Sequence, residues 1–92
     1  MKHNIIVKWK DRETNKRIEQ IKAIFNETLS IPGIHEVTYT FNCIDRPNRY
    51  DLMITIDMDE EALAAYDASD PHHEWKETFG DLIEKKAIFD YQ

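Results

Sequence analysis

Alternating apolar and polar residues divide much of the chain into short extended segments. Residues 4–9, 35–43 and 51–58 each place apolar side chains at every second position, the repeat of a half-buried strand. Residues 87–91 close the sequence with a fourth segment of the same kind. Pro47 and Asn48, between the second and third segments, are typical of a surface turn and predict a hairpin there.

Apolar residues at helical spacing fill the region between the first and second strands. This pattern begins after Thr14 or Asn15, either of which can cap a helix, and continues to Leu29. Pro32 and Gly33 then favour the end of the helix. One amphipathic helix is therefore expected before the second strand.

Two further helices are predicted between the third and fourth strands. Asp59 precedes a short one, and Asp70 followed by Pro71 predicts the start of a longer one. The buried face of the longer helix is predicted to consist of Trp75, Phe79, Leu82 and Ile83.

The order of elements predicts an α+β fold of the ferredoxin-like βαββαβ type, formed by a single domain spanning residues 1–92. Four antiparallel strands would then carry their helices on one face. The opposite face mixes polar with large apolar side chains, which predicts a homodimer through that sheet face. Its residues are Ile6, Thr38, Thr40, Met53, Phe89 and Tyr91.

Charge and composition limit the partners that we expect. Eighteen acidic against twelve basic side chains give a net charge of −6, which disfavours nucleic acid and anionic membrane surfaces. No apolar run is long enough to span a membrane. Cys43, the single cysteine, falls within the second strand pattern, where we expect an inert buried thiol. These features favour the reducing cytoplasm.

The familiar cofactor and metal motifs are missing from the sequence. Two glycines cannot supply a glycine-rich phosphate loop, and neither serine lies in a nucleophile elbow. No cysteine pair, HExxH or calcium-loop pattern is present. His73 and Glu77 are four residues apart, but their helix face is otherwise charged, so a solvated face is favoured over a metal site. We therefore expect neither a cofactor nor a metal.

His72 and Tyr66 are the strongest candidates for chemistry. His72 falls on the predicted buried face with Trp75, in the first helical turn, where the helix dipole disfavours imidazolium. Tyr66 ends the preceding short helix on its inward face. A neutral imidazole and a phenol that meet there can act as a general base and a hydrogen-bond donor. The alternative is a pair of amphipathic core residues with hydrogen-bonded polar tips.

Three more polar rings share the parity of the apolar strand residues. They are His3, His35 and Tyr39. If that parity faces the helices, these rings project into the same space and could help to bind a ligand. For the two histidines, each at the beginning of a strand, a purely structural role is the favoured interpretation.

Several segments, taken together, resemble the stress-responsive dimeric α/β-barrel (Dabb) domain along essentially the whole chain. They are IIVKWK at 5–10, IPGI at 31–34, YDL at 50–52, ALAAY at 62–66 with DPH at 70–72, and IFDY at 88–91. The resemblance implies a ferredoxin-like subunit whose sheet packs on that of a twin to form a dimeric α/β barrel.

The family's tyrosine and histidine motif carries over to Tyr66 and His72, which keep its six-residue interval. Ser69 stands where the family usually has another histidine, and the proline is displaced by one position to Pro71. A shift of one residue would instead select His73, which falls off the apolar stripe.

The resemblance implies a fold more firmly than a reaction. Well-understood members are plant polyketide cyclases that work without a cofactor, so the leading hypothesis is a dimer that binds a small, partly apolar or aromatic molecule. The alternatives are a non-enzymatic stress-associated scaffold and a cofactor-free monooxygenase. The expected lining of the cavity, beyond the polar rings, is Ile5, Val7, Ile21, Ile24, Leu52, Ile54, Trp75 and Ile88.

Overall fold

Four strands form one antiparallel sheet in the computed structural model, which describes residues 1–92. They are β1 (Lys2–Trp9), β2 (Ile34–Phe41), β3 (Leu52–Met58) and β4 (Ile83–Tyr91). Their order across the sheet is β2-β3-β1-β4, so β2 and β4 are the two edges. The predicted ferredoxin-like fold is confirmed.

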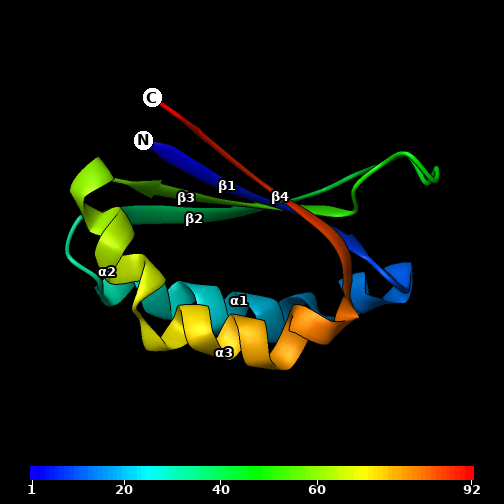
Figure 1. The fold of residues 1–92 in the computed structure, drawn as a ribbon, viewed down its shortest axis with the longest axis horizontal. Helices are drawn as coiled ribbons and strands as arrows, with labels where there is room; N and C mark the ends of the chain where they lie inside the picture. The colour runs from blue at the N-terminus through cyan, green and yellow to red at the C-terminus, as the bar shows by residue number, and fades with distance from the viewer.

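The helices all lie on one face of this sheet (Figure 1). They are α1 (Ile18–Asn26), α2 (Leu63–Asp67) and α3 (Asp70–Phe79). Helices α1 and α3 pack against each other beneath the strands, and α2 lies at one end of this layer (Figure 1). None of the helices is both long and apolar enough to cross a membrane.

The helix predicted from Thr14 or Asn15 to Leu29 is shorter than expected. A 3-10 segment, Arg12–Arg17, precedes α1, and another, Glu27–Ser30, follows it. Asp11 caps the first segment by accepting a hydrogen bond from the backbone of Glu13. The Asn15 side chain instead accepts a hydrogen bond from the indole of Trp9 at 2.8 Å, so it is engaged in tertiary structure rather than in capping.

Strand β2 ends at Phe41, two residues before the predicted end, and Cys43 is exposed rather than buried. The Asn42 side chain accepts a hydrogen bond from the backbone of Ile44, which turns the chain away from the sheet. The guanidinium of Arg12 also donates to the Asn42 carbonyl at 2.9 Å. The prediction that Cys43 is buried was therefore wrong.

The end of α3 and the start of β4 also differ from the prediction. Ile83, expected on the buried face of the helix, is the first residue of β4 and pairs with Trp9. Pairing with β1 therefore extends the strand four residues before Ala87, where its pattern begins in the sequence. At the other end of α3, Ser69 rather than Asp70 is the N-cap.

Aromatic side chains fill the centre of the layer between sheet and helices. The ring of Trp75 lies 5.0 Å from Phe25, 5.3 Å from Phe79 and 6.0 Å from Trp9, measured between ring centroids. All four side chains are at most 2% exposed. This cluster closes the middle of the layer between sheet and helices.

Candidate functional site

The pairing of β4 with β1 decides which side chains of this edge strand face the helices. His3 is paired with Asp90, and Ile5 with Ile88. Directly paired residues lie on the same side of a sheet. Ile5 belongs to the core beneath the sheet, so the other three side chains also project toward the helix layer.

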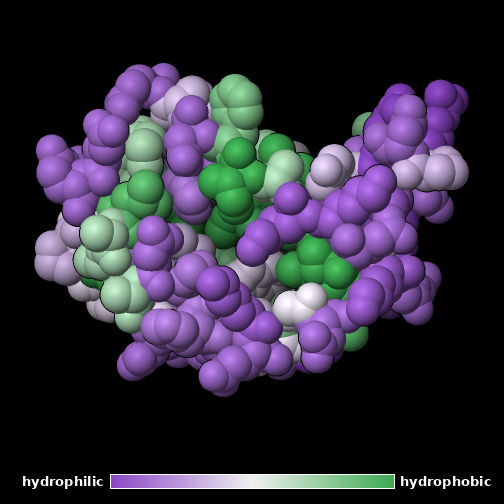
Figure 2. Space-filling view, viewed as in Figure 1, coloured by the Kyte–Doolittle hydropathy of each residue, from purple (hydrophilic) through white to green (hydrophobic).

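A cavity of about 270 Å³ lies below this edge. Strands β1 and β4 form its roof, and α2 and α3 form its walls. The space-filling view shows apolar surface in the gap between β4 and α3, bordered by hydrophilic side chains (Figure 2). The lining residues are His3, Ile5, Leu63, Tyr66, Asp67, His72, Trp75, Lys76, Lys86 and Ile88.

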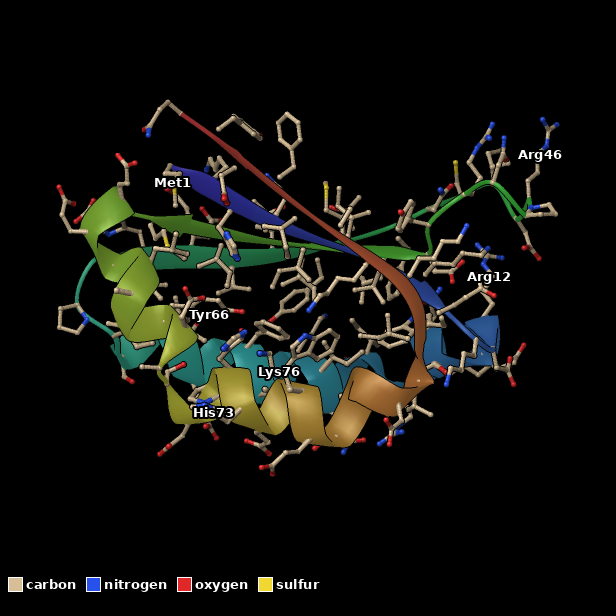
Figure 3. All side chains as sticks on the ribbon, in the orientation of Figure 1. Met1, Arg12, Arg46, Tyr66, His73 and Lys76 are labelled. Carbon is tan, nitrogen blue, oxygen red and sulfur yellow. The ribbon has the colours of Figure 1, made fainter.

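Tyr66 is the most enclosed polar side chain of the cavity. It is 1% exposed, and its hydroxyl is buried without any hydrogen-bond partner. Figure 3 shows it reaching from α2 into the layer between the sheet and α3. Burial, with a smaller effect of the Asp67 carboxylate, raises the pKa of the phenol above its ordinary value. The hydroxyl therefore keeps its proton and is a hydrogen-bond donor without an acceptor.

The N-terminus of α3 fixes the ring of His72. The Ser69 side chain accepts a hydrogen bond from the His72 backbone, which starts the helix at this point. The ring Nδ1 lies 2.8 Å from the carbonyl oxygen of Asp67. A carbonyl can only accept, so Nδ1 carries a proton, and in the neutral ring the unprotonated nitrogen is Nε2.

Two imidazole rings contact Tyr66. The centroid of the His72 ring lies 4.9 Å from that of Tyr66, and the His3 ring meets it edge-on at 5.4 Å. His3 is 6% exposed, and its Nδ1 lies 2.5 Å from a carboxylate oxygen of Asp90. Asp90 thereby orients His3, much as the Asp67 carbonyl orients His72. No group of three or more His, Cys, Asp or Glu side chains in the molecule is arranged to hold a metal ion.

Comparison with known protein families shows to which family this chain is similar. The model of the stress responsive A/B barrel domain matches residues 1–92. The chain belongs to that family. No curated protein matches it significantly.

Solved structures share the fold of this A/B barrel domain over nearly its whole length. A dimeric ferredoxin-like protein of unknown function from Thermobifida fusca is 17% identical, with a TM-score of 0.78, and the match covers 98% of this chain and 87% of that one. A protein from Arabidopsis thaliana is 22% identical, with a TM-score of 0.77, covering 99% and 92%. The hydroxynitrile lyase from Passiflora edulis is 20% identical, with a TM-score of 0.74, covering 98% and 89%. Identities this low support the fold alone.

The structure brings together part of the predicted site of this A/B barrel domain. The residues that line the cavity, as expected, are His3, Ile5, Tyr66, His72, Trp75 and Ile88. His73, the neighbour that a one-residue shift would select, is exposed and does not line the cavity. The six-residue interval thus identifies the histidine that reaches the cavity.

His35 and Tyr39 do not lie at this cavity, contrary to the prediction. Both belong to β2, the opposite edge of the sheet from β4. An irregularity in register next to Ile34 leaves His35 exposed, where it pairs with Asp59 at 3.0 Å. Tyr39 faces the helices, but its hydroxyl donates to the side chain of Asn26. Alternation along a strand predicts on which side of the sheet a side chain lies. The order of the strands across the sheet decides which cavity that side chain can reach.

Five predicted apolar lining residues are enclosed in the core instead. Each is at most 3% exposed, and none lines the cavity, because neighbouring side chains and the central aromatic cluster cover them. They are Val7, Ile21, Ile24, Leu52 and Ile54.

Sequence reasoning missed the charged part of the site. Asp67, Lys76 and Lys86 line the cavity, and Asp90 orients His3. Lys86 and Asp90 could have been predicted, because both alternate in step with Ile88 and so lie on the same side of β4. The other two belong to helices, and only the packing of α2 against α3 brings them to the cavity.

Proposed function

We propose that this A/B barrel domain binds a small, partly apolar or aromatic molecule between its sheet and helices and transfers a proton on it without a cofactor. The observation that carries the proposal is the Tyr66 hydroxyl, which is buried and unpartnered at the cavity. A buried donor without an acceptor costs about 1–3 kcal/mol of stability. A bound oxygen atom that accepts from this hydroxyl would recover that cost.

The chemistry follows from the two oriented rings. His72 Nε2 takes a proton from a carbon next to a carbonyl group of the ligand, and the electron pair moves onto the carbonyl oxygen. The protonated hydroxyl of Tyr66 then donates a hydrogen bond to this developing enolate oxygen. The hydroxynitrile lyase of the same fold supports such a use of the architecture, although its low identity transfers no reaction.

A ligand screen by thermal shift tests the proposed site. Aromatic ketones and phenols that raise the melting temperature of the wild-type domain should raise it less in His72→Ala and in Tyr66→Phe. The unliganded Tyr66→Phe protein should be as stable as wild type or more stable by about 1 kcal/mol, because the substitution removes an unpartnered hydroxyl. A variant that is stable but insensitive to ligand separates binding from folding.

His73→Ala is the matched control, since it removes the exposed histidine next to His72. It should leave the ligand-induced shift unchanged. A compound that stabilises wild type, His72→Ala and Tyr66→Phe equally would remove both residues from the site. For ketones that bind, exchange of the acidic carbon protons in D₂O, followed by NMR, should be about 10²–10⁴-fold slower with His72→Ala than with wild type.

We also propose that two copies of the domain pack through the outer faces of their sheets. Phe89 and Tyr91 on β4 are 62% and 51% exposed, and their rings lie 6.3 Å apart. Ile6 and Met53 form part of an apolar hollow of about 230 Å³ on the same face. The Thermobifida fusca protein of this fold is dimeric.

Replacing both exposed aromatics, as Phe89→Asp with Tyr91→Asp, should reduce the mass in light scattering from that of two chains to 11.0 kDa. Two buried carboxylates without partners oppose association strongly. Leu29→Asp, at an apolar residue of similar exposure outside the sheet, is the control and should stay dimeric. A wild-type protein of 11.0 kDa at micromolar concentration would overturn the dimer.

A further inference from the structure

The inner side of β4 is unusually charged for a strand that faces a helix layer. Lys86 is paired with the fully buried Val7, and Asp90 with His3. Only Ile88 between them is apolar. An edge strand that served packing alone would bury apolar side chains at these positions, as β1 does. Lys86 lines the cavity and Asp90 orients the lining residue His3, so both charges point to a role in the cavity.

Asp90 and Lys86, the two charged residues that flank Ile88 on this side of the strand, differ in whether they have a partner of opposite charge. The Asp90 carboxylate pairs with the imidazole of His3 at 2.5 Å. Lys86 has no salt bridge within 4.0 Å and no hydrogen bond from its side chain. Lys86 is an exposed residue at the rim of the cavity, and its ammonium group has no anionic partner in the protein.

A second free ammonium group comes from the helix across the opening. Lys76 lines the cavity from α3 (Figure 3) and likewise has no salt bridge. Glu74 and Glu77 are two and one positions away, which is the wrong spacing for contact on a helix. Two cations from separate elements therefore lie at one opening, although the whole chain carries a net charge of −6.

One carboxylate, that of Asp67, also belongs to the cavity wall and has no salt bridge. Among the lysine and carboxylate side chains that line the cavity, two ammonium groups and this one carboxylate sum to a net charge of +1. A single negative charge balances it, whereas a phosphate dianion would leave an excess. The volume of about 270 Å³ is near the lower end of ordinary ligand sites, which suits a one-ring molecule.

We infer that the ligand class is a small aromatic carboxylic acid, whose carboxylate binds Lys76 and Lys86 while its apolar ring packs on Trp75, Ile5 and Ile88. This inference rests on the proposed function, since the same ligand presents an oxygen atom to Tyr66. The two lysines hold the anion at the opening and orient the ring toward the deeper hydroxyl.

Titrations of the whole protein with matched acids and amides test the charge requirement. The probes are 4-hydroxybenzoate and 4-hydroxyphenylacetate, each against its uncharged amide, with tryptophan fluorescence and NMR chemical shifts as readouts. The acids should bind wild type about tenfold more tightly than the amides, and less so at high salt. Lys76→Gln and Lys86→Gln should each weaken acid binding about five- to tenfold and leave amide binding unchanged.

Lys85→Gln is the matched control, because Lys85 has the same charge on the same strand but the opposite parity to Lys86. It should leave both affinities unchanged. Acids and amides that bind equally, with binding lost in Tyr66→Phe, would overturn the charge inference and leave the proposed function standing. An equal loss in Lys85→Gln would overturn it as a mere effect of net charge. Failure of every probe to bind would count against the proposed function and the inference together.

Discussion

Trp75→Ala should lower the free energy of unfolding by about 3–5 kcal/mol, the range expected for removing a large aromatic side chain from a closed core. Trp75 contacts Phe25, Phe79 and Trp9 and is 2% exposed. Domains of this size are stable by only about 5–15 kcal/mol in total. The substitution thus removes a large fraction of the stability, which urea denaturation at fixed protein concentration measures directly.

A milder variant keeps this prediction testable if the alanine protein does not fold. Trp75→Phe retains a ring and should cost less than half as much. Leu29→Ala, at a side chain that is 45% exposed, should change the stability by no more than about 0.5 kcal/mol. Equal losses at Trp75 and Leu29 would show that the aromatic cluster is not the centre of the core.

Stability should also fall steeply in alkaline solution, and Tyr66 should account for a defined part of that fall. Burial raises the pKa of Tyr66 above the ordinary phenol value of 10.0 and that of Tyr39 to about 12. Above pH 10 the unfolded chain releases these phenolic protons while the folded chain retains them. The stability that these two tyrosines contribute is therefore complete below pH 10. It is lost as the pH rises toward their pKa values in the folded protein.

The enclosed Tyr66 adds about 1.4 kcal/mol per pH unit to the decline above pH 10, as long as the folded chain retains its proton. Tyr66→Phe should remove one such increment, giving a protein whose unfolding free energy falls less between pH 10 and 12. Comparing the two slopes cancels the titration of lysines, which both proteins share. Parallel slopes for wild type and Tyr66→Phe would mean that this phenol ionises freely in the folded state.

Alternation along the chain was enough to predict the layers of the fold. Ile5 and Val7 on β1, and Ile54 and Ile56 on β3, are buried as their parity predicts, because one face of each central strand is covered by helices. The predicted ends of helices and strands were wrong where tertiary contacts outweigh the local preference for helix or strand. Ile83 satisfies a helical pattern, but it is drawn into the sheet by its pairing with Trp9.

The meeting of Tyr66 and His72 could be predicted because the two residues are close together in sequence. Tyr66 and His72 are separated by one capped turn, so helical spacing alone brings both rings to the same side. His35 and Tyr39 depend on the order of strands across the sheet, which alternation does not encode. Lys76 was missed for a different reason, since a charged residue beside a buried helix face is ordinarily solvated.

The His3 and Asp90 pair joins two residues that are 87 positions apart, one at each end of the chain. Most of β4 is exposed, so this edge strand is held mainly by its backbone hydrogen bonds with β1. A molecule bound beneath it would hold both ends of the chain in place at once. Amide hydrogen exchange in β4 should then slow on occupancy, while exchange in the central strand β3 stays unchanged. Ligand binding at this site would thus also stabilise the edge strand β4 against local unfolding.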